Sequence, residues 1–226
     1  ITDMQSVILH GLHKRRGFLF SIIHVKITVT DVMKFLSPQI LIRSPASPSC
    51  PHKLHSRHSA FRTAFFFYFA PLVGTTCDHD GNLTYGGIRY HKHGIKYDLV
   101  DVTDEDLTCD SFNCNLVLLP AAVFEEMGNF DEHFTHAMGD FDYGLRIKRA
   151  GHPIESTRRY VGICERNPLK KTWADTNLTR RERFRLKESP KGLPFKEWFY
   201  FLRKNFGLGT ALVRSLTPYG KILAGK

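Results

Sequence analysis

The sequence predicts an α/β protein with a mixed sheet, flanking helices and further helices near its C-terminal end. Three observations support this fold class. Residues 21–29 are rich in β-branched side chains, as strands are. Residues 114–119 form an apolar strand that leads into a helix over 121–127. A second helix over 140–150 precedes a short strand over 161–164.

The strand over 21–29 is the first element that the pattern predicts. Thr30 and Asp31 follow it, and both residue types favour the start of a helix, here a short one over 32–36. Later in the chain, residues 80–82 read Asp-Gly-Asn and predict a turn. Residues 83–90 then form or flank a short strand or hairpin.

The helices are indicated by apolar residues at helical spacing and by glycines where the pattern stops. Gly128 follows the helix over 121–127, and Gly151 follows the helix over 140–150. Pro120 ends the preceding strand. The C-terminal region is basic and helical. It holds an Arg-rich helix over 178–188 and an aromatic and basic helix over 195–206. A last helix follows, and we expect it to be broken at Thr-Pro-Tyr (217–219).

Composition excludes several classes of protein. The chain has 226 residues, with 42% hydrophobic and 24% charged residues, which is typical of a globular domain and rules out a wholly disordered chain or a collagen. Five cysteines argue against a disulfide framework and favour a reducing compartment. The longest apolar run, over 64–73, is too short to cross a membrane, and we find no secretory signal pattern.

Charge is concentrated toward the N-terminal side of the chain. The formal net charge is +10, and residues 1–76 hold nine Lys and Arg against two acids. Residues 37–71 contain four interior prolines, no acid, and an aromatic run over 65–69. A basic tail, a phosphate-binding segment and a segment not shaped by folding are all open interpretations. One hypothesis is that 37–71, with 1–20, is translated out of frame, which the other reading frames would reveal.

The carboxylates Asp140 and Asp142 carry the clearest candidate chemistry. They lie two positions apart at the start of a predicted helix, where the helix dipole favours anions. An ionised carboxylate at a junction between a loop and a helix can act as a general base for a hydroxyl group. The alternative is that both only cap the helix, and the spacing alone favours that alternative.

The surrounding sequence resembles the acceptor-side half of bacterial family 2 glycosyltransferases. The phrases that carry the resemblance are NLVL, FEEMGNFDE and GDFDYGLR, followed by Ala-Gly, and they are supported by VG, CERN, KGLP and Trp198 farther on. Gly139 stands where the family has Glu. The resemblance covers residues 72–226 and touches the strand over 21–29 only weakly.

This resemblance implies a GT-A fold, incomplete in its N-terminal half, and inverting transfer of a sugar from a nucleotide donor to an acceptor hydroxyl. Asp140 is then the catalytic base, and Asp142, Arg146 and Asn115 bind substrate or support the site. The implied role is hexosyl or rhamnosyl transfer in cell-surface polysaccharide or glycolipid synthesis. The partners would be a nucleotide-sugar and a saccharide or lipid-linked acceptor, in the cytoplasm or peripheral to the inner membrane.

The family also implies a divalent metal, Mg²⁺ or Mn²⁺, held against the donor diphosphate by an Asp-x-Asp motif. Asp78 and Asp80 have the right spacing, although a simple turn is the favoured interpretation of these two residues. Residues 37–71 offer no acid for this role. The donor half is therefore missing or scrambled.

The resulting organisation has three parts: a degenerate remnant of the nucleotide-binding half (1–71), the acceptor-side half (72–168) and a helical extension (169–226). In the helical extension, the aromatic helix over 195–206 either lies on a membrane surface or packs on the catalytic part. The Arg residues of the extension form either a solvated face or a phosphate-binding patch. Cys109 and Cys114 are expected in the core. The alternative function is a non-enzymatic basic protein that binds anionic membrane or nucleic acid, and no nucleic-acid partner is expected of the enzyme.

Overall fold

A mixed β-sheet runs through the part of the chain that the computed structural model describes. This part comprises residues 4–14, 17–27, 70–92, 94–136 and 138–226, and in the first two ranges only the backbone strands are described. Predictions that fall on other residues, including the short helix over 32–36, lie outside it. The strand order is β2 (Gly17–Ile27), β1 (Met4–Lys14), β9 (Val117–Pro120), β3 (Leu72–Cys77), β10 (Ile154–Ile163) and β7 (Thr108–Cys109).

Parallel and antiparallel pairs both occur in this sheet, which confirms the predicted α/β class with a mixed sheet. β10 and β3 are parallel, whereas β1–β2, β1–β9, β3–β9 and β10–β7 are antiparallel. The strand β4 (Leu83–Tyr85) pairs with β3 across the turn that was predicted over 80–82. The strand predicted over 21–29 overlaps β2, which begins earlier and pairs with β1 as a hairpin.

A second, smaller sheet lies against the first. It consists of β6 (Tyr97–Leu99), β5 (Gly87–Tyr90) and β8 (Ser111–Phe112) in that order. Gly87 lies where the two sheets approach each other closely. A Cβ atom there would be 2.2 Å from the Cys109 Sγ and 2.3 Å from the Ser156 Oγ, so only glycine fits. The Gly87 amide uses this closeness to donate to the Ser156 Oγ over 3.2 Å.

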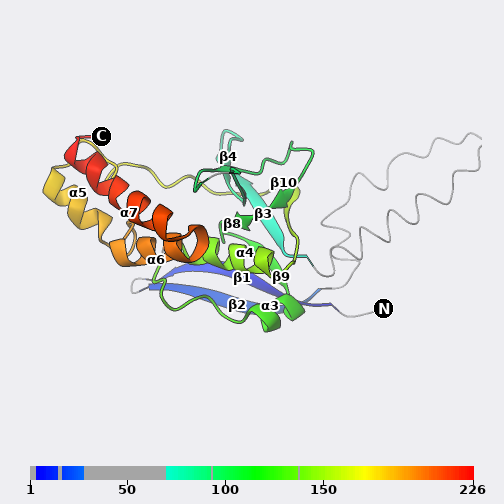
Figure 1. The fold of residues 1–226 in the computed structure, drawn as a ribbon. Helices are drawn as coiled ribbons and strands as arrows, with labels where there is room; N and C mark the ends of the chain where they lie inside the picture. Colours follow the sequence, from blue (N-terminus) through cyan, green and yellow to red (C-terminus); the bar gives the residue numbers. More distant parts are fainter. Residues whose placement is uncertain (1–3, 15–16, 28–69, 93, 137) are drawn as a thin grey trace, which may run out of the picture.

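Five described helices accompany the sheets: α3 (Ala121–Met127), α4 (Gly139–Arg149), α5 (Arg180–Lys187), α6 (Phe195–Phe206) and α7 (Leu208–Leu223). The bounds of α3 and α6 match the prediction, and α4 differs from it by one residue at each end. Gly128 and Gly151 follow α3 and α4 with φ of 67° and 91°, which glycine adopts without strain. Figure 1 shows α5, α6 and α7 grouped at one end of the molecule, at the left of the view.

Helix α4 lies between two hydrophobic cores and is fixed by both. Tyr143 and Ile147 belong to the core between α4, α3 and the main sheet, to which β9 contributes Val117 and Leu119. Phe141, on another side of α4, belongs to a second core with Ile88, Phe201, Leu202 and Ala211. Burial of a large apolar side chain contributes about 1.5–3 kcal/mol. The two cores therefore fix the position of the helix that carries Asp140.

The position of α6 answers a question that the sequence left open. Phe201 and Leu202 are buried in the second core, and Trp198, Phe199 and Phe206 pack against it. This helix therefore packs on the rest of the protein through its apolar side. Among the described residues, no helix is both long enough and apolar enough to span a membrane.

The predicted break at Thr217-Pro218-Tyr219 is wrong, because α7 continues through Pro218 to Leu223. A proline inside a helix leaves the carbonyl four residues earlier without its usual amide donor. Here that carbonyl belongs to Arg214, and the Trp198 indole Nε1 of α6 donates to it over 3.3 Å. Pro218 is itself buried, together with Ser215 and Ile222, so packing holds the helix together.

We expect Trp198→Phe to reduce the free energy of unfolding by about 1 kcal/mol beyond the loss of packing area, because it leaves the Arg214 carbonyl without a donor. The same substitution in a Pro218→Ala background should cost less, since alanine at this position supplies an amide to that carbonyl. Urea unfolding of the four proteins in this double-mutant cycle measures the coupling. Equal costs in both backgrounds would show that the indole does not replace the missing amide.

Candidate active site around Asp140

The start of α4 has an unusual backbone conformation. Met138, which precedes the helix, has φ 68°, a left-handed conformation that is uncommon for residues other than glycine. Its side chain packs against the second core, which offsets the cost of this conformation. Strained backbone of this kind concentrates at functional sites. The strain fixes the direction in which the first turn of α4, with Asp140, leaves the preceding loop.

The Asp140 carboxylate is held in place by backbone amides. Its Oδ2 accepts from the Cys114 amide over 3.2 Å, and its Oδ1 accepts from the Phe141 amide over 2.9 Å. Burial raises the pKa of Asp140 to about 6, although these amide hydrogen bonds act in the opposite direction. The residue keeps part of its surface exposed. A carboxylate that is ionised at neutral pH, and basic enough to take a proton, is a suitable general base.

The loop whose Cys114 amide binds Asp140 contacts both parallel strands. The loop that contains Cys114 precedes β9, and its Leu116 carbonyl accepts from the Gly74 amide of β3 over 2.9 Å. The Asn115 Nδ2 of the same loop donates to the Sγ of Cys164, the residue that follows β10, over 3.4 Å. In α/β sheets, ligands bind outside the carboxyl ends of parallel strands. Asn115 therefore reaches the carboxyl end of β10, and the residue before it binds Asp140 through its amide.

An exposed aromatic ring packs on the first turn of α4, next to Asp140 in the sequence. Tyr97 of β6 is 44% exposed and makes an edge contact with the Phe141 ring, with centroids 5.5 Å apart. Burial and then the negative charge of Asp140 raise the pKa of Tyr97, while Arg166 lowers it. Burial, and then the negative charge of Asp140, also raise the pKa of the Cys114 thiol. The site thus combines one carboxylate with an accessible aromatic surface.

Asp142 does not share this environment with Asp140. Its buried carboxylate accepts from the Lys204 Nζ over 2.8 Å and from the Asn205 Nδ2 over 3.0 Å, both on α6. Lys204 also pairs with Asp131 over 2.8 Å. Burial alone would raise the pKa of Asp131, but hydrogen bonds from Lys204, His133 and Tyr200 hold it well below its usual range. This network ties α4 and the loop before it to α6.

Arg146 lies on a different side of α4 from Asp140, as six residues of helical rotation require. Its guanidinium donates to the Asn129 carbonyl over 2.9 Å and also to the Met127 carbonyl. The Tyr143 hydroxyl donates to the intervening Gly128 carbonyl over 2.9 Å. Three successive carbonyls at the end of α3 are therefore satisfied by α4. The support that Arg146 gives is structural and acts through the neighbouring helix.

Asp78 forms a turn, as the favoured interpretation predicted. Its Oδ1 accepts from the amides of Asp80 and Asn82 over 3.0 and 2.8 Å, and its Oδ2 accepts from the Asn82 side chain over 3.0 Å. No group of three His, Cys, Asp or Glu side chains that could hold a metal occurs within the described part of the chain. The turn occupies the Asp78 carboxylate, the assignment of Asp78 and Asp80 as metal ligands stays a prediction, and no step is derived through a metal.

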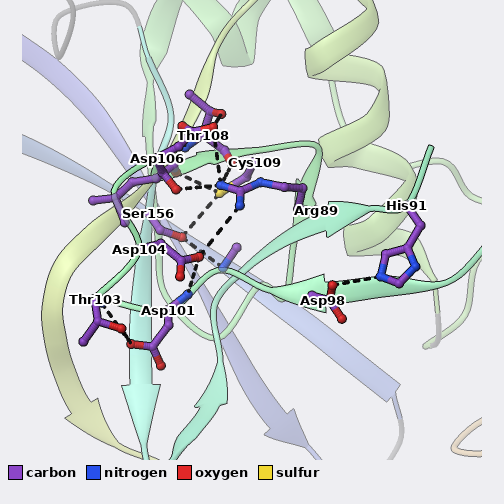
Figure 2. Close-up of polar contacts among 12 residues, drawn as sticks. Arg89, His91, Asp98, Asp101, Thr103, Asp104, Asp106, Thr108, Cys109 and Ser156 are labelled. Atoms are coloured by element: carbon purple, nitrogen blue, oxygen red, sulfur yellow. Dashed lines mark hydrogen bonds and ion pairs between the residues drawn. The ribbon is translucent and has the colours of Figure 1, made fainter.

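A second polar cluster surrounds Arg89 of β5, and its acidic members lie in the connection between β6 and β7 (Figure 2). The Arg89 guanidinium donates to the carbonyls of Asp106 and Thr108 over 2.6 and 3.1 Å. It also lies 3.8 Å from the Asp104 carboxylate and 3.6 Å from that of Asp106. Hydrogen bonds from Thr108 hold the pKa of Asp106 below its usual range. This cluster orders the loop, and its carboxylates are engaged by Arg89 and Thr108.

The cysteines and arginines that the sequence singled out have structural roles or lie on the surface. Cys109 and Cys114 are buried, as expected, and all four described cysteines are free thiols. Within the Arg-rich helix α5, Arg183 is buried and donates to the Trp173 carbonyl over 2.8 Å. The exposed arginines of that helix are Arg180, Arg181 and Arg185.

Sequence reasoning missed Tyr97 and the Cys114 amide near Asp140, and it missed Lys204 as the partner of Asp142. Tyr97 lies in a three-residue strand without a periodic signal, and Lys204 is separated from Asp142 by 62 residues. A backbone amide carries no residue-type signal at all. No protein-family model and no curated protein sequence matches this chain.

Proposed function

We propose that this protein is an inverting glycosyltransferase with a GT-A-type fold that uses Asp140 to deprotonate an acceptor hydroxyl. The observation that carries the proposal is the Asp140 carboxylate at the start of α4. It is held by two backbone amides, has a pKa raised to about 6, and is bound by the loop that reaches the carboxyl end of β10. The resemblance of residues 72–226 to family 2 glycosyltransferases gives the reaction class.

The reaction is a single displacement in which Asp140 acts on the acceptor. As the acceptor oxygen attacks the anomeric carbon, its proton passes to the Asp140 carboxylate, and the bond to the nucleoside diphosphate breaks. The two amide hydrogen bonds aim the carboxylate before substrate arrives, which reduces the reorganisation that the reaction requires. The acceptor is a saccharide, free or lipid-linked.

Tyr97 supports the proposal as an acceptor contact, because its exposed ring packs on Phe141, the residue after Asp140, and offers an apolar surface for the C–H face of a sugar. We expect Tyr97→Ala to raise KM for the acceptor about tenfold, with a smaller change in kcat. Tyr97→Phe keeps the ring and should keep KM close to wild type. Initial rates against acceptor concentration measure both. An equal loss in the two variants would assign the effect to the hydroxyl group instead.

The test of the proposal is a turnover and binding panel. The full chain is mixed with UDP-, GDP-, dTDP- and CMP-linked sugars and with saccharide acceptors, and nucleotide release is measured with and without Mn²⁺. In parallel, each nucleoside diphosphate is tested for an increase in melting temperature, which a ligand that binds only the native state must produce. Acceptor-dependent release with any donor supports the proposal. Absence of both release and stabilisation across the panel contradicts it.

A further inference from the structure

The last helix, α7, exposes a line of leucines that no described residue covers. Leu208, Leu212, Leu216 and Leu223 are each 55–59% exposed, and Val213 beside them is 68% exposed. Spacings of four, four and seven residues place the leucines on one side of the helix. The buried residues of α7 face another direction and are Ala211, Ser215, Pro218 and Ile222. We call the five exposed residues the leucine stripe.

The segment that contains the leucine stripe is strongly basic. Residues 169–226 hold 14 Lys and Arg against four Asp and Glu, whereas residues 77–168 hold nine against 16. No acid occurs after Glu197. Exposed basic residues are found on all three helices, including Arg180, Arg181 and Arg185 on α5, Lys196 and Arg203 on α6, and Arg214 and Lys221 on α7.

The three helices form one unit, so their charges act together. Arg183 of α5 donates to the Lys226 carbonyl just beyond α7. The Lys187 Nζ of α5 lies 3.8 Å from the centroid of the Tyr219 ring of α7. Trp198 of α6 donates to the Arg214 carbonyl of α7. The apolar stripe and the basic side chains of all three helices therefore belong to one packed unit, in which Arg214 and Lys221 lie across α7 from the stripe.

We infer that the leucine stripe of α7 docks on an anionic lipid surface, with the stripe at the boundary between headgroups and acyl chains. Exposed apolar side chains and excess positive charge on one helical unit are the features of helices that lie in the membrane interface. Each Lys or Arg near an anionic membrane adds to the attraction. This inference does not depend on the proposed reaction, because none of its residues lies at Asp140.

A second copy of the chain is a poorer occupant of the same surface. Two copies that met through α7 would bring together two units with a large excess of positive charge. Like charges brought together across an interface are unfavourable, whereas an anionic membrane neutralises them. The charge therefore distinguishes a lipid surface from self-association.

The test is sedimentation of the full chain with lipid vesicles. Vesicles of phosphatidylcholine alone are compared with vesicles that also contain phosphatidylglycerol, at low and at high ionic strength. We expect binding to the anionic vesicles at low ionic strength and progressive loss as salt screens the charges. The double variant Leu212→Glu/Leu216→Glu should reduce the partition coefficient about tenfold or more, since it removes apolar area and adds negative charge.

A matched control separates the stripe from the added charge. Ile163 and Leu169 are 61% and 71% exposed and lie outside α7, so Ile163→Glu/Leu169→Glu makes the same chemical change elsewhere. It should reduce binding much less than the stripe variant does. Circular dichroism of both variants confirms that they are folded, which exposed positions allow.

Three results would overturn the inference. The first is equal binding to neutral and anionic vesicles, and the second is equal binding of the stripe variant and wild type. The third is a dimer in light scattering that the stripe variant dissociates, without vesicle binding by the wild type. Because vesicle binding needs no donor or acceptor, its failure is distinguishable from failure of the glycosyltransferase proposal.

Discussion

Asp140→Asn should reduce the rate of sugar transfer by about a factor of 10³ while the protein stays folded. Asparagine has the same shape as the carboxylate, and its amide oxygen can keep one of the two backbone hydrogen bonds. It cannot accept a proton from the acceptor hydroxyl. Initial rates of nucleotide release measure the loss, and circular dichroism with thermal unfolding measures the fold.

The matched control is Asp98→Asn, which makes the same change in an exposed carboxylate of β6 that pairs with His91. This variant should transfer sugar at close to the wild-type rate. If Asp140→Asn also keeps its rate, Asp140 is not the base, and the assignment of the site is wrong.

The raised pKa of Asp140 gives the same proposal a pH dependence. A pKa of about 6 means that the carboxylate is mostly protonated below that pH and mostly ionised above it. Only the ionised form accepts the acceptor proton, so kcat/KM should rise with pH and level off above about pH 7. A profile that is flat from pH 5 to pH 8 would argue against a base with this pKa.

Gly144→Ala should destabilise the protein by about 3 kcal/mol or prevent its folding. A Cβ atom at this position in α4 would lie 2.5 Å from the Ser111 Oγ and 2.7 Å from the Ser111 Cα. The Ser111 hydroxyl also donates to the Phe141 carbonyl over 2.8 Å, which holds the helix close to β8. Because α4 is packed in two cores, it cannot shift to make room.

Gly220→Ala is the control for Gly144→Ala, because it also adds one methyl group inside a helix. A Cβ atom at Gly220 would meet no atom within 4 Å, and alanine favours helix by about 1 kcal/mol over glycine. This variant should be as stable as wild type or slightly more stable. Urea unfolding of both variants makes the comparison, and similar stabilities would refute the close contact between α4 and β8.

Local signals predicted much of the fold. Periodic apolar positions and the glycines after each helix fixed α3 and α4 to within one residue, since both signals act within a few residues of the backbone they shape. The limits of β9 and β10 were less accurate, because strand pairing over long sequence separations sets them. Pro218 misled the prediction for the same reason, since the Trp198 indole that compensates for it lies 20 residues away.

The candidate site was predicted in part. Asp140 was singled out by its place at the start of a predicted helix together with the family resemblance, and Asn115 by the resemblance alone. Asn115 follows Cys114, whose amide binds the Asp140 carboxylate. Asp142 carries the same signal, yet its carboxylate binds Lys204 and Asn205, because the position of α6 decides what a buried acid meets. Arg146 likewise donates to backbone carbonyls at the end of α3. Backbone carbonyls are present at every residue, so the sequence does not indicate which of them a side chain will bind.

The second core, in which α4 meets α6 and α7, bears on how the chain can be shortened. A fragment that ended ahead of α5 would expose Ile88 and Phe141 to water and would leave the interior Asp142 without its cation. Removal of one partner from a buried ion pair typically costs about 3–5 kcal/mol. Expression of the acceptor-side half alone should therefore give aggregated material, and useful fragments must retain the C-terminal helices.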